Sequence, residues 1–134
     1  MYQEPEGKLA VARGRNGNLY NPSQKDMKRW SMVARTQVPR RLAGFRGAVH
    51  MHIDAFFARK ADHFDKDGNL TEEAPRYHTE TPDSDNISKF IGDCLTGMAY
   101  VDDKQCYHTS CTKRWTQAQQ QGPRTVVTLT YEKI

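Results

Sequence analysis

Residues 82–89 read Pro-Asp-Ser-Asp-Asn-Ile-Ser-Lys, and this stretch starts a helix in the second half of the chain. Asp85 or Asn86 is a suitable N-cap residue for that helix. Asp83 and Asp85 are two positions apart, so their carboxylates point to one side of an extended segment that enters the helix. Lys89 follows Asp85 by one helical turn. The stretch therefore gathers two acids and a lysine at one helix start.

The segments around this stretch predict a small α+β (mixed α/β) fold. Residues 48–57 alternate apolar and polar side chains, which is typical of a strand with one buried face. The helix that starts at Asp85 or Asn86 is expected to run to about Thr96, with Gly97 as its stop. The other expected elements are a helix from Asn21-Pro22-Ser23 to about Gln37 and strands at Lys8–Arg13, Gln105–Trp115 and Arg124–Lys133. We therefore expect a single domain, residues 1–134, with an about four-stranded mixed sheet and two main helices.

Apolar periodicity also predicts which side chains form the core. The chain is 37% hydrophobic with a mean hydropathy of −0.86, so the core is modest and the surface strongly polar. The expected core residues are Val49, Met51, Ile53, Ala55 and Phe57 in the strand, Met27, Trp30, Ala34 and Val38 in the first helix, and Ile87, Phe90, Ile91, Cys94, Leu95 and Met98 in or just after the second.

Residues 58–81 are polar and without periodicity, and they are long for a connection, which suggests a functional loop. Within it, residues 63–74 place Asp65, Asp67 and Gly68 where a calcium-binding loop needs them. However, His63 and Ala74 occupy the positions where aspartate and a bidentate glutamate belong. We therefore interpret this segment as an Asp-Gly turn, with a small hairpin as one form of it.

Charge is distributed very unevenly along the chain, although the net charge is only +4. Residues 1–60 carry twelve Lys/Arg against four Asp/Glu, residues 61–103 carry three against eleven, and residues 104–134 carry five against one. An acidic centre between basic flanks fits a protein that grips a polyanion while an acidic pocket holds cations. A patchwork surface without function is the alternative.

Several protein classes are disfavoured by the sequence. No run approaches the roughly 18 apolar residues of a membrane span, and residues 1–6 do not resemble a secretory signal. Three cysteines, an odd number, indicate free thiols in a reducing compartment. We therefore expect a cytoplasmic protein that has no membrane partner.

The acidic residues suggest a metal site. Carboxylate oxygens at close quarters suit Mg²⁺, or Mn²⁺ as a substitute, rather than zinc. Asp83 and Asp85 form one half of the expected site, and Asp102 or Asp103 must arrive from elsewhere in the fold to complete it. Such a cluster commonly supports two-metal hydrolysis of phosphodiester bonds. Lys89 is placed to neutralise charge on the phosphate that is cut.

The spacing of these residues is equally consistent with purely structural roles. Asp85 can be a helix cap, the pair Asp102-Asp103 can be a turn, and Lys89 can form an ion pair with Asp93, four residues on.

Basic side chains could contact the backbone of a nucleic acid, although solvated basic surfaces are common. The candidates are Arg13, Arg15, Lys25, Lys28, Arg29 and Arg76. Cys106, His108 and Cys111 could be a zinc half-site, but a strand there would turn Cys106 and His108 to one face and Cys111 to the other.

The acidic residues belong to an ordered motif. It reads Asp83-x-Asp85-Asn86-x-x-Lys89, then Asp93-x-Leu95 and a glycine, then an aromatic-hydrophobic-Asp102-Asp103-x-Gln105 run. This motif closely resembles that of the RusA family of Holliday-junction resolvases. The resemblance is dense over residues 82–106 and looser at Ala12–Arg15 and Tyr20–Pro22.

The resemblance implies a Mg²⁺-dependent endodeoxyribonuclease that cuts four-way junctions by paired symmetric nicks in DNA recombination and repair. Family members are bacterial or prophage proteins, so the expected compartment is the cytoplasm of a bacterium or a phage-infected host. The resemblance also implies a homodimer, since a four-way junction has two-fold symmetry. The essential carboxylates would correspond to Asp83, Asp85 and Asp103, supported by Asp102, and the essential lysine to Lys89.

The sequence departs from this pattern in a short first strand and a long loop at residues 58–81. Two alternative functions remain at this stage. One is a non-catalytic, basic DNA-binding protein, and the other is a nuclease with a broader choice of branched DNA.

Overall fold

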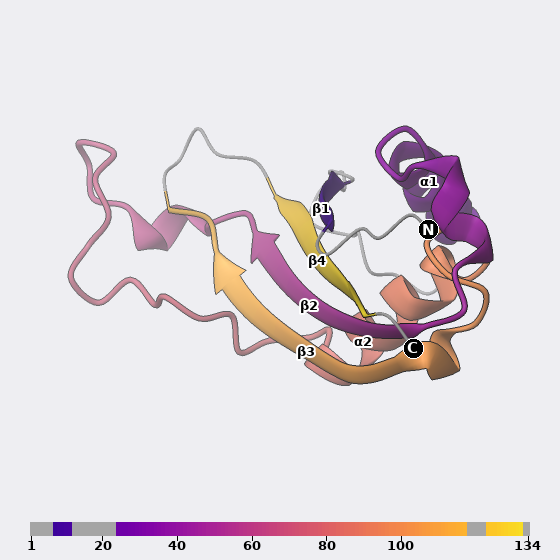
Figure 1. Cartoon of the computed structure of the whole chain (residues 1–134). Helices are drawn as coiled ribbons and strands as arrows, with labels where there is room; N and C mark the ends of the chain where they lie inside the picture. The colour runs from indigo at the N-terminus through magenta and orange to yellow at the C-terminus, as the bar shows by residue number, and fades with distance from the viewer. Residues whose placement is uncertain (1–6, 12–23, 118–122, 133–134) are drawn as a thin grey trace.

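The computed structural model describes residues 7–11, 24–117 and 123–132 of the chain. Along the chain the elements are β1 (Gly7–Val11), α1 (Gln24–Arg35), η2 (Arg40–Gly44), β2 (Ala48–Phe57), η3 (Ala61–His63), α2 (Ser84–Leu95), η4 (Asp103–Gln105), β3 (Cys106–Trp115) and β4 (Arg124–Glu132), where η denotes a short 3-10 helix (Figure 1). The expected helix start at Asn21-Pro22-Ser23 lies outside the described residues. The expected strand ends at Arg13 and Lys133 also lie outside the described residues, and the remaining expected boundaries are confirmed to within three residues.

Three long strands form a mixed sheet in the order β4-β2-β3, and the five-residue β1 pairs with the outer edge of β4. At the centre of β2, Ile53 lies opposite Val127 of the antiparallel β4 and Cys111 of the parallel β3. Parallel neighbours need a long crossover. The connection after β2, together with α2, supplies it. The predicted α+β class, with a mixed sheet and two main helices, is confirmed.

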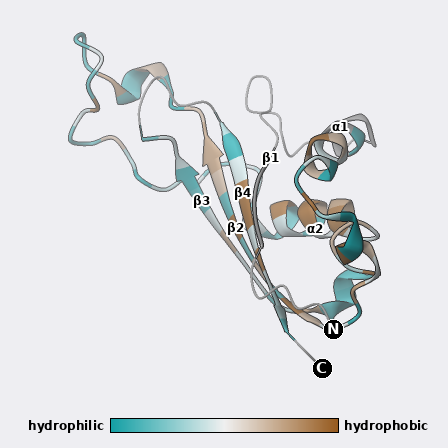
Figure 2. Cartoon of the chain, turned by 45° about the horizontal axis from the view of Figure 1, so that its top comes forward, coloured by the Kyte–Doolittle hydropathy of each residue, from teal (hydrophilic) through white to brown (hydrophobic). Residues whose placement is uncertain are grey.

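The core lies on one face of the sheet. Along β2, buried residues alternate strictly with half-buried ones. Both helices lie on the same side of the sheet, and hydrophobic segments of α2 face it (Figure 2). The rings of Trp30 in α1 and Phe90 in α2 pack in a T-shaped arrangement, with ring centroids 6.3 Å apart. All the predicted core residues are buried except Met27, whose side chain the structure does not describe.

The turn after α2 is fixed to the sheet. The hydroxyl of Tyr131 in β4 donates a hydrogen bond of 2.9 Å to the carbonyl of Ala99. The hydroxyl of Tyr100 donates one of 3.0 Å to the carbonyl of Gly92. Gly97 has φ +80°, a conformation that favours glycine at the end of a helix. The predicted stop at Gly97 is therefore confirmed.

The connection between β2 and α2 contains the predicted hairpin. Phe64 and Leu70 form an antiparallel bridge. Between them the Asp65 carboxylate accepts hydrogen bonds from the backbone N–H groups of Asp67 and Asn69, at 2.9 and 3.0 Å. Gly68 has φ +83°. These are the contacts of an Asp-Gly turn.

The end of the same connection pairs with β3, which the sequence does not predict. The His78 N–H donates to the carbonyl of Lys113 at 3.0 Å, and the Trp115 N–H donates to the carbonyl of Arg76 at 3.1 Å. These bonds cover the outer edge of β3 near its C-terminal end. Within the described ranges, neither helix has the length and apolar character that a membrane crossing requires.

Candidate active site

The N-terminus of α2 carries Asp83 and Asp85, and Asp83 is its N-cap. The Asp83 carboxylate accepts a hydrogen bond of 3.0 Å from the backbone N–H of Asn86. The prediction that Asp85 or Asn86 caps the helix is therefore wrong. The helix starts earlier because Asp83 has extended backbone, φ −79° and ψ 164°, and its short side chain reaches the free N–H groups. Asp85 falls in the first turn, where the helix dipole favours a negative charge.

Lys89 lies one turn after Asp85 on the exposed side of α2. Among the described residues it forms no ion pair, so the structural alternative, a pair with Asp93, is not formed here. An exposed cation without a partner in this part of the fold remains available to an external anion.

The second acidic segment is a turn between α2 and β3. Asp102 caps η4 and accepts a hydrogen bond of 3.0 Å from the Lys104 N–H, which lowers the pKa of its carboxyl. The structural interpretation of Asp102 as a turn residue is thus correct. Asp103, the first residue of η4, does not take part in this cap and is exposed.

Gln105 holds this turn in place. Its side-chain oxygen accepts hydrogen bonds from the N–H groups of Val101 and Asp102, at 3.0 and 2.9 Å. Its side-chain nitrogen donates to the carbonyls of Phe45 and Gly47, at 2.9 and 2.8 Å. One amide therefore ties the acidic turn to the segment that enters β2. The sequence motif includes Gln105, but nothing in its spacing reveals these distant partners.

Asp103 lies directly over α2. The Cβ position of Gly92 lies 3.7 Å from an oxygen of Asp103, so this carboxylate is in van der Waals range of the helix at Gly92. Burial raises the pKa of the Asp103 carboxyl, and so do hydrogen bonding and charge repulsion with Asp102 and Asp93. A cation at this position would relieve that repulsion.

The two acidic segments lie on one face of α2. Gly92 follows Asp85 by seven residues, which is about 20° short of two helical turns and about 10 Å along the axis. Lys89 falls between them on the same face. The structure therefore aligns Asp85, Lys89 and Asp103, but it does not gather their carboxylates into one cluster. Among the described residues, no three His, Cys, Asp or Glu side chains are close enough together to hold a metal ion.

The donor set nevertheless suits magnesium or manganese. Each end of the face offers carboxylate oxygens, the hard ligands that these ions prefer. Magnesium is usually held by one or two carboxylates together with waters and substrate phosphates, not by a complete protein cage. One carboxylate oxygen of Asp83 accepts the hydrogen bond that caps the helix, and the remaining lone pairs of the same carboxylate can still bind a metal ion. Two separated acidic pairs therefore fit ions that a bound phosphate would help to coordinate.

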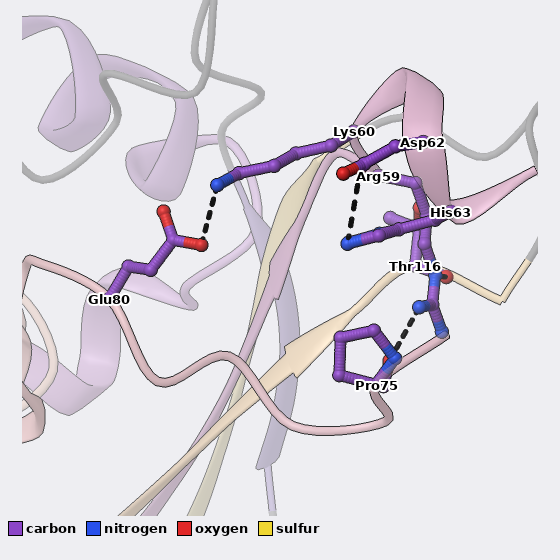
Figure 3. Close-up of polar contacts among 7 residues, drawn as sticks. All are labelled: Arg59, Lys60, Asp62, His63, Pro75, Glu80 and Thr116. Atoms are coloured by element: carbon purple, nitrogen blue, oxygen red, sulfur yellow. Dashed lines mark hydrogen bonds and ion pairs between the residues drawn. The ribbon is translucent and has the colours of Figure 1, made fainter. Parts of the chain in front are cut away.

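The long connection leads directly into the first acidic pair and makes contacts of its own. Lys60 forms an ion pair of 2.6 Å with Glu80, and the Arg59 guanidinium donates to the carbonyls of Thr116 and Pro75 (Figure 3). His78 is buried, with its ring stacked 3.8 Å from that of Phe57. The loop predicted to be functional is thus tied to the end of the sheet.

The predicted DNA-binding residues are only partly described. Arg13 and Arg15 lie outside the described residues, and the structure does not describe the side chains of Lys25 and Arg29. Lys28 and Arg76 are exposed. Arg76 lies beside Trp115, at the opposite end of β3 from Asp103, and a ten-residue strand is about 30 Å long. Arg76 is therefore far from the acidic face.

A zinc half-site at Cys106, His108 and Cys111 is not formed. His108 and Cys111 face opposite sides of the sheet as predicted, but the prediction that Cys106 faces the same side as His108 is wrong. A bulge between Val49 and His50 shifts the register by one residue. Cys106 and Cys111 therefore both pack against the core, while His108 stacks on His50 at 4.7 Å on the other face. Burial raises the pKa of the Cys111 thiol to about 11, which disfavours the thiolate that zinc requires.

The comparison with known protein families assigns the chain to a family. The family model described as endodeoxyribonuclease RusA matches residues 4–130, nearly the whole chain. No curated protein matches the chain significantly. The match includes α2, the acidic turn and the strands that hold them. The chain therefore belongs to the RusA family of endodeoxyribonucleases, Holliday-junction resolvases that hydrolyse DNA.

Proposed function

We propose that this protein is a Mg²⁺-dependent endonuclease that resolves four-way DNA junctions by paired, symmetric nicks during recombination and repair. The observation that carries the proposal is the alignment of Asp85, Lys89 and the Asp103 carboxylate on one exposed face of α2, with Asp83 at the helix start. The family match adds the substrate class.

In this proposal, Asp83, Asp85 and Asp103 hold the divalent ions, and Asp102 supports Asp103. The ions, when bound, activate a water molecule and stabilise the oxygen that leaves. Asp103 suits this role because its carboxyl lies against Asp93 and Asp102, and that repulsion favours cation binding. Asp102 contributes indirectly, since its carboxylate fixes the turn through the Lys104 N–H.

Lys89 binds the phosphate that is cut. It extends from the middle of the face, between the two carboxylate groups, and has no ion-pair partner among the described residues. A lysine ammonium is a compact charge that stabilises the extra negative charge of the transition state.

The proposal includes a homodimer, because a four-way junction has two-fold symmetry and paired nicks need two equivalent active sites. A prophage or bacterial host is part of the same proposal. The protein's basic flanks, outside the acidic centre, would follow the phosphates of the junction arms.

The test is cleavage of a labelled four-way junction by single variants. Asp85→Asn and Asp103→Asn should abolish nicking in Mg²⁺ while junction binding is kept or tightened, since each change removes a negative charge near phosphate. Glu72→Gln, which removes an exposed carboxylate from the distant loop, is the matched control and should cut normally.

Normal nicking by the Asp85→Asn protein would disprove the site assignment. A panel of flaps, forks and three-way junctions distinguishes a resolvase from a nuclease of broader choice: equal cutting of all of them would favour the second.

A further inference from the structure

A cleft of about 390 Å³ opens where the C-terminal end of α1, the start of η2 and the turn after α2 come together. Figure 1 shows η2 in purple beside the orange turn after α2. The residues that line the cleft are Arg35, Val38, Arg40, Ala43, Gly97 and Met98. They include two cations and no acid. The volume is within the range of ligand pockets.

The two arginines of the cleft are exposed and have no ion-pair partner among the described residues. Other arginines of the fold are engaged. Arg59 donates to two backbone carbonyls, and Arg114 pairs with the Asp54 carboxylate at 3.3 Å. Unlike Arg59 and Arg114, Arg35 and Arg40 are therefore not engaged in an ion pair within the described part of the fold.

The sequence around the cleft lacks acidic residues altogether. Residues 27–53 contain no Asp or Glu, and their basic residues are Lys28, Arg29, Arg35, Arg40, Arg41 and Arg46. The nearest acid along α2 is Asp93, four residues before Gly97, and its carboxylate shares a hydrogen bond with Asp103. The cleft is thus electropositive and separate from the acidic face.

The remaining walls suit a sugar-phosphate group. Val38 and Met98, whose exposed fractions are only 7% and 6%, add apolar surface to the lining of the cleft. The carbonyls at the C-terminal end of α2 would disfavour an anion. Their effect is reduced, because the Leu95 carbonyl accepts hydrogen bonds from the N–H groups of Met98 and Ala99.

We propose that this cleft binds a backbone phosphate of a DNA arm, a few nucleotides from the phosphate that is cut. This inference rests on the proposed function, which places the cut phosphate at Lys89. α2 ends at Leu95, about 9 Å beyond Lys89 along the helix axis, and Gly97 follows in the turn. The cleft is therefore close enough to Lys89 for another phosphate of the same DNA arm to reach it. Arginine suits the position because its guanidinium binds two phosphate oxygens at once.

The experiment measures binding of a labelled duplex and a labelled four-way junction, without divalent ions, over a range of salt concentrations. Cleavage plays no part, so failure of the proposed nuclease function does not affect the result. Arg35→Ala and Arg40→Ala should each weaken binding to both DNAs about tenfold and reduce the slope of log affinity against log salt by about one. Lys66→Ala, which removes an exposed cation from the distant hairpin, is the control.

Unchanged affinity and salt slope in both arginine variants would overturn the proposal. So would equal losses in the Lys66→Ala control. Tighter binding of adenosine monophosphate or inorganic phosphate than of duplex would assign the cleft to a free phosphate instead. Loss of a dimer in sedimentation would make it an interface between copies of the chain. If an alanine variant misfolds, Arg35→Lys and Arg40→Lys keep the charge: the proposal then requires weaker binding with an unchanged salt slope.

Discussion

Replacing Gln105 by glutamate is the most informative test of how the acidic turn is held. The two side chains have the same shape, so the substitution creates no cavity. The oxygen that accepts hydrogen bonds from Val101 and Asp102 is kept. The nitrogen that donates to the carbonyls of Phe45 and Gly47 becomes an oxygen, which cannot donate.

The expected cost follows from these contacts. Two hydrogen bonds are lost, at about 1 kcal/mol each, and two carbonyls are left facing a negative charge. We expect the free energy of unfolding to fall by about 2–4 kcal/mol. For a chain of this size, 1 kcal/mol changes Tm by about 4 °C, so Tm should fall by about 8–16 °C.

The assay combines thermal unfolding with junction cleavage at a temperature where the variant is folded. Cleavage should fall about a hundredfold, because small displacements of catalytic groups have effects of that size. Lys104→Gln, next to the same turn, is the control for stability and should leave Tm unchanged. A Gln105→Glu protein as stable as the wild type would refute the proposed hydrogen-bond network.

Three further predictions concern the acidic face and the long loop. Asp83→Asn should keep Tm, because asparagine also caps helices, yet abolish junction cleavage; a lower Tm with normal cleavage would make Asp83 only a cap. Lys89→Ala should lower kcat far more than junction affinity in steady-state kinetics, and a loss of affinity alone would make it a simple backbone contact. Burial, and then Lys113, lowers the pKa of His78, so its contribution to stability is complete above about pH 6.5 and is lost as the pH falls below that value. His78→Phe, which keeps the ring beside Phe57, should therefore flatten the decrease in Tm between about pH 7.5 and 5.5, and an unchanged slope would argue against a buried neutral histidine.

Much of the fold follows from local patterns in the sequence. The strand at Ala48–Phe57 is found with the expected bounds, because strict alternation permits only one buried face. The apolar face of α2 and its stop at Gly97 are also as expected, since both depend on residues within a few turns of each other. The helix start is the exception. Several residues near Asp83 are good caps, and the chain's geometry selects the first of them.

Other features depend on contacts between distant segments and could not be predicted. The bulge at Val49 and His50 is decided by how β2 and β3 pair, and it turns Cys106 to the opposite face from His108. The partners of Gln105 lie about sixty residues away in the chain. The spacing of residues in the sequence predicts that Asp103 lies near the acidic helix. It does not predict which turn of the helix Asp103 contacts, because that also depends on contacts between distant segments.

We propose that the acidic face of α2 makes this protein a metal-dependent junction endonuclease. To test this, the wild-type protein is incubated with a four-way junction, each strand labelled in turn, with and without Mg²⁺. We expect nicks at symmetric positions in two opposite strands, and only when the ion is present. A gel shift with all four strands intact under both conditions would contradict it and would support a DNA-binding protein without catalytic activity.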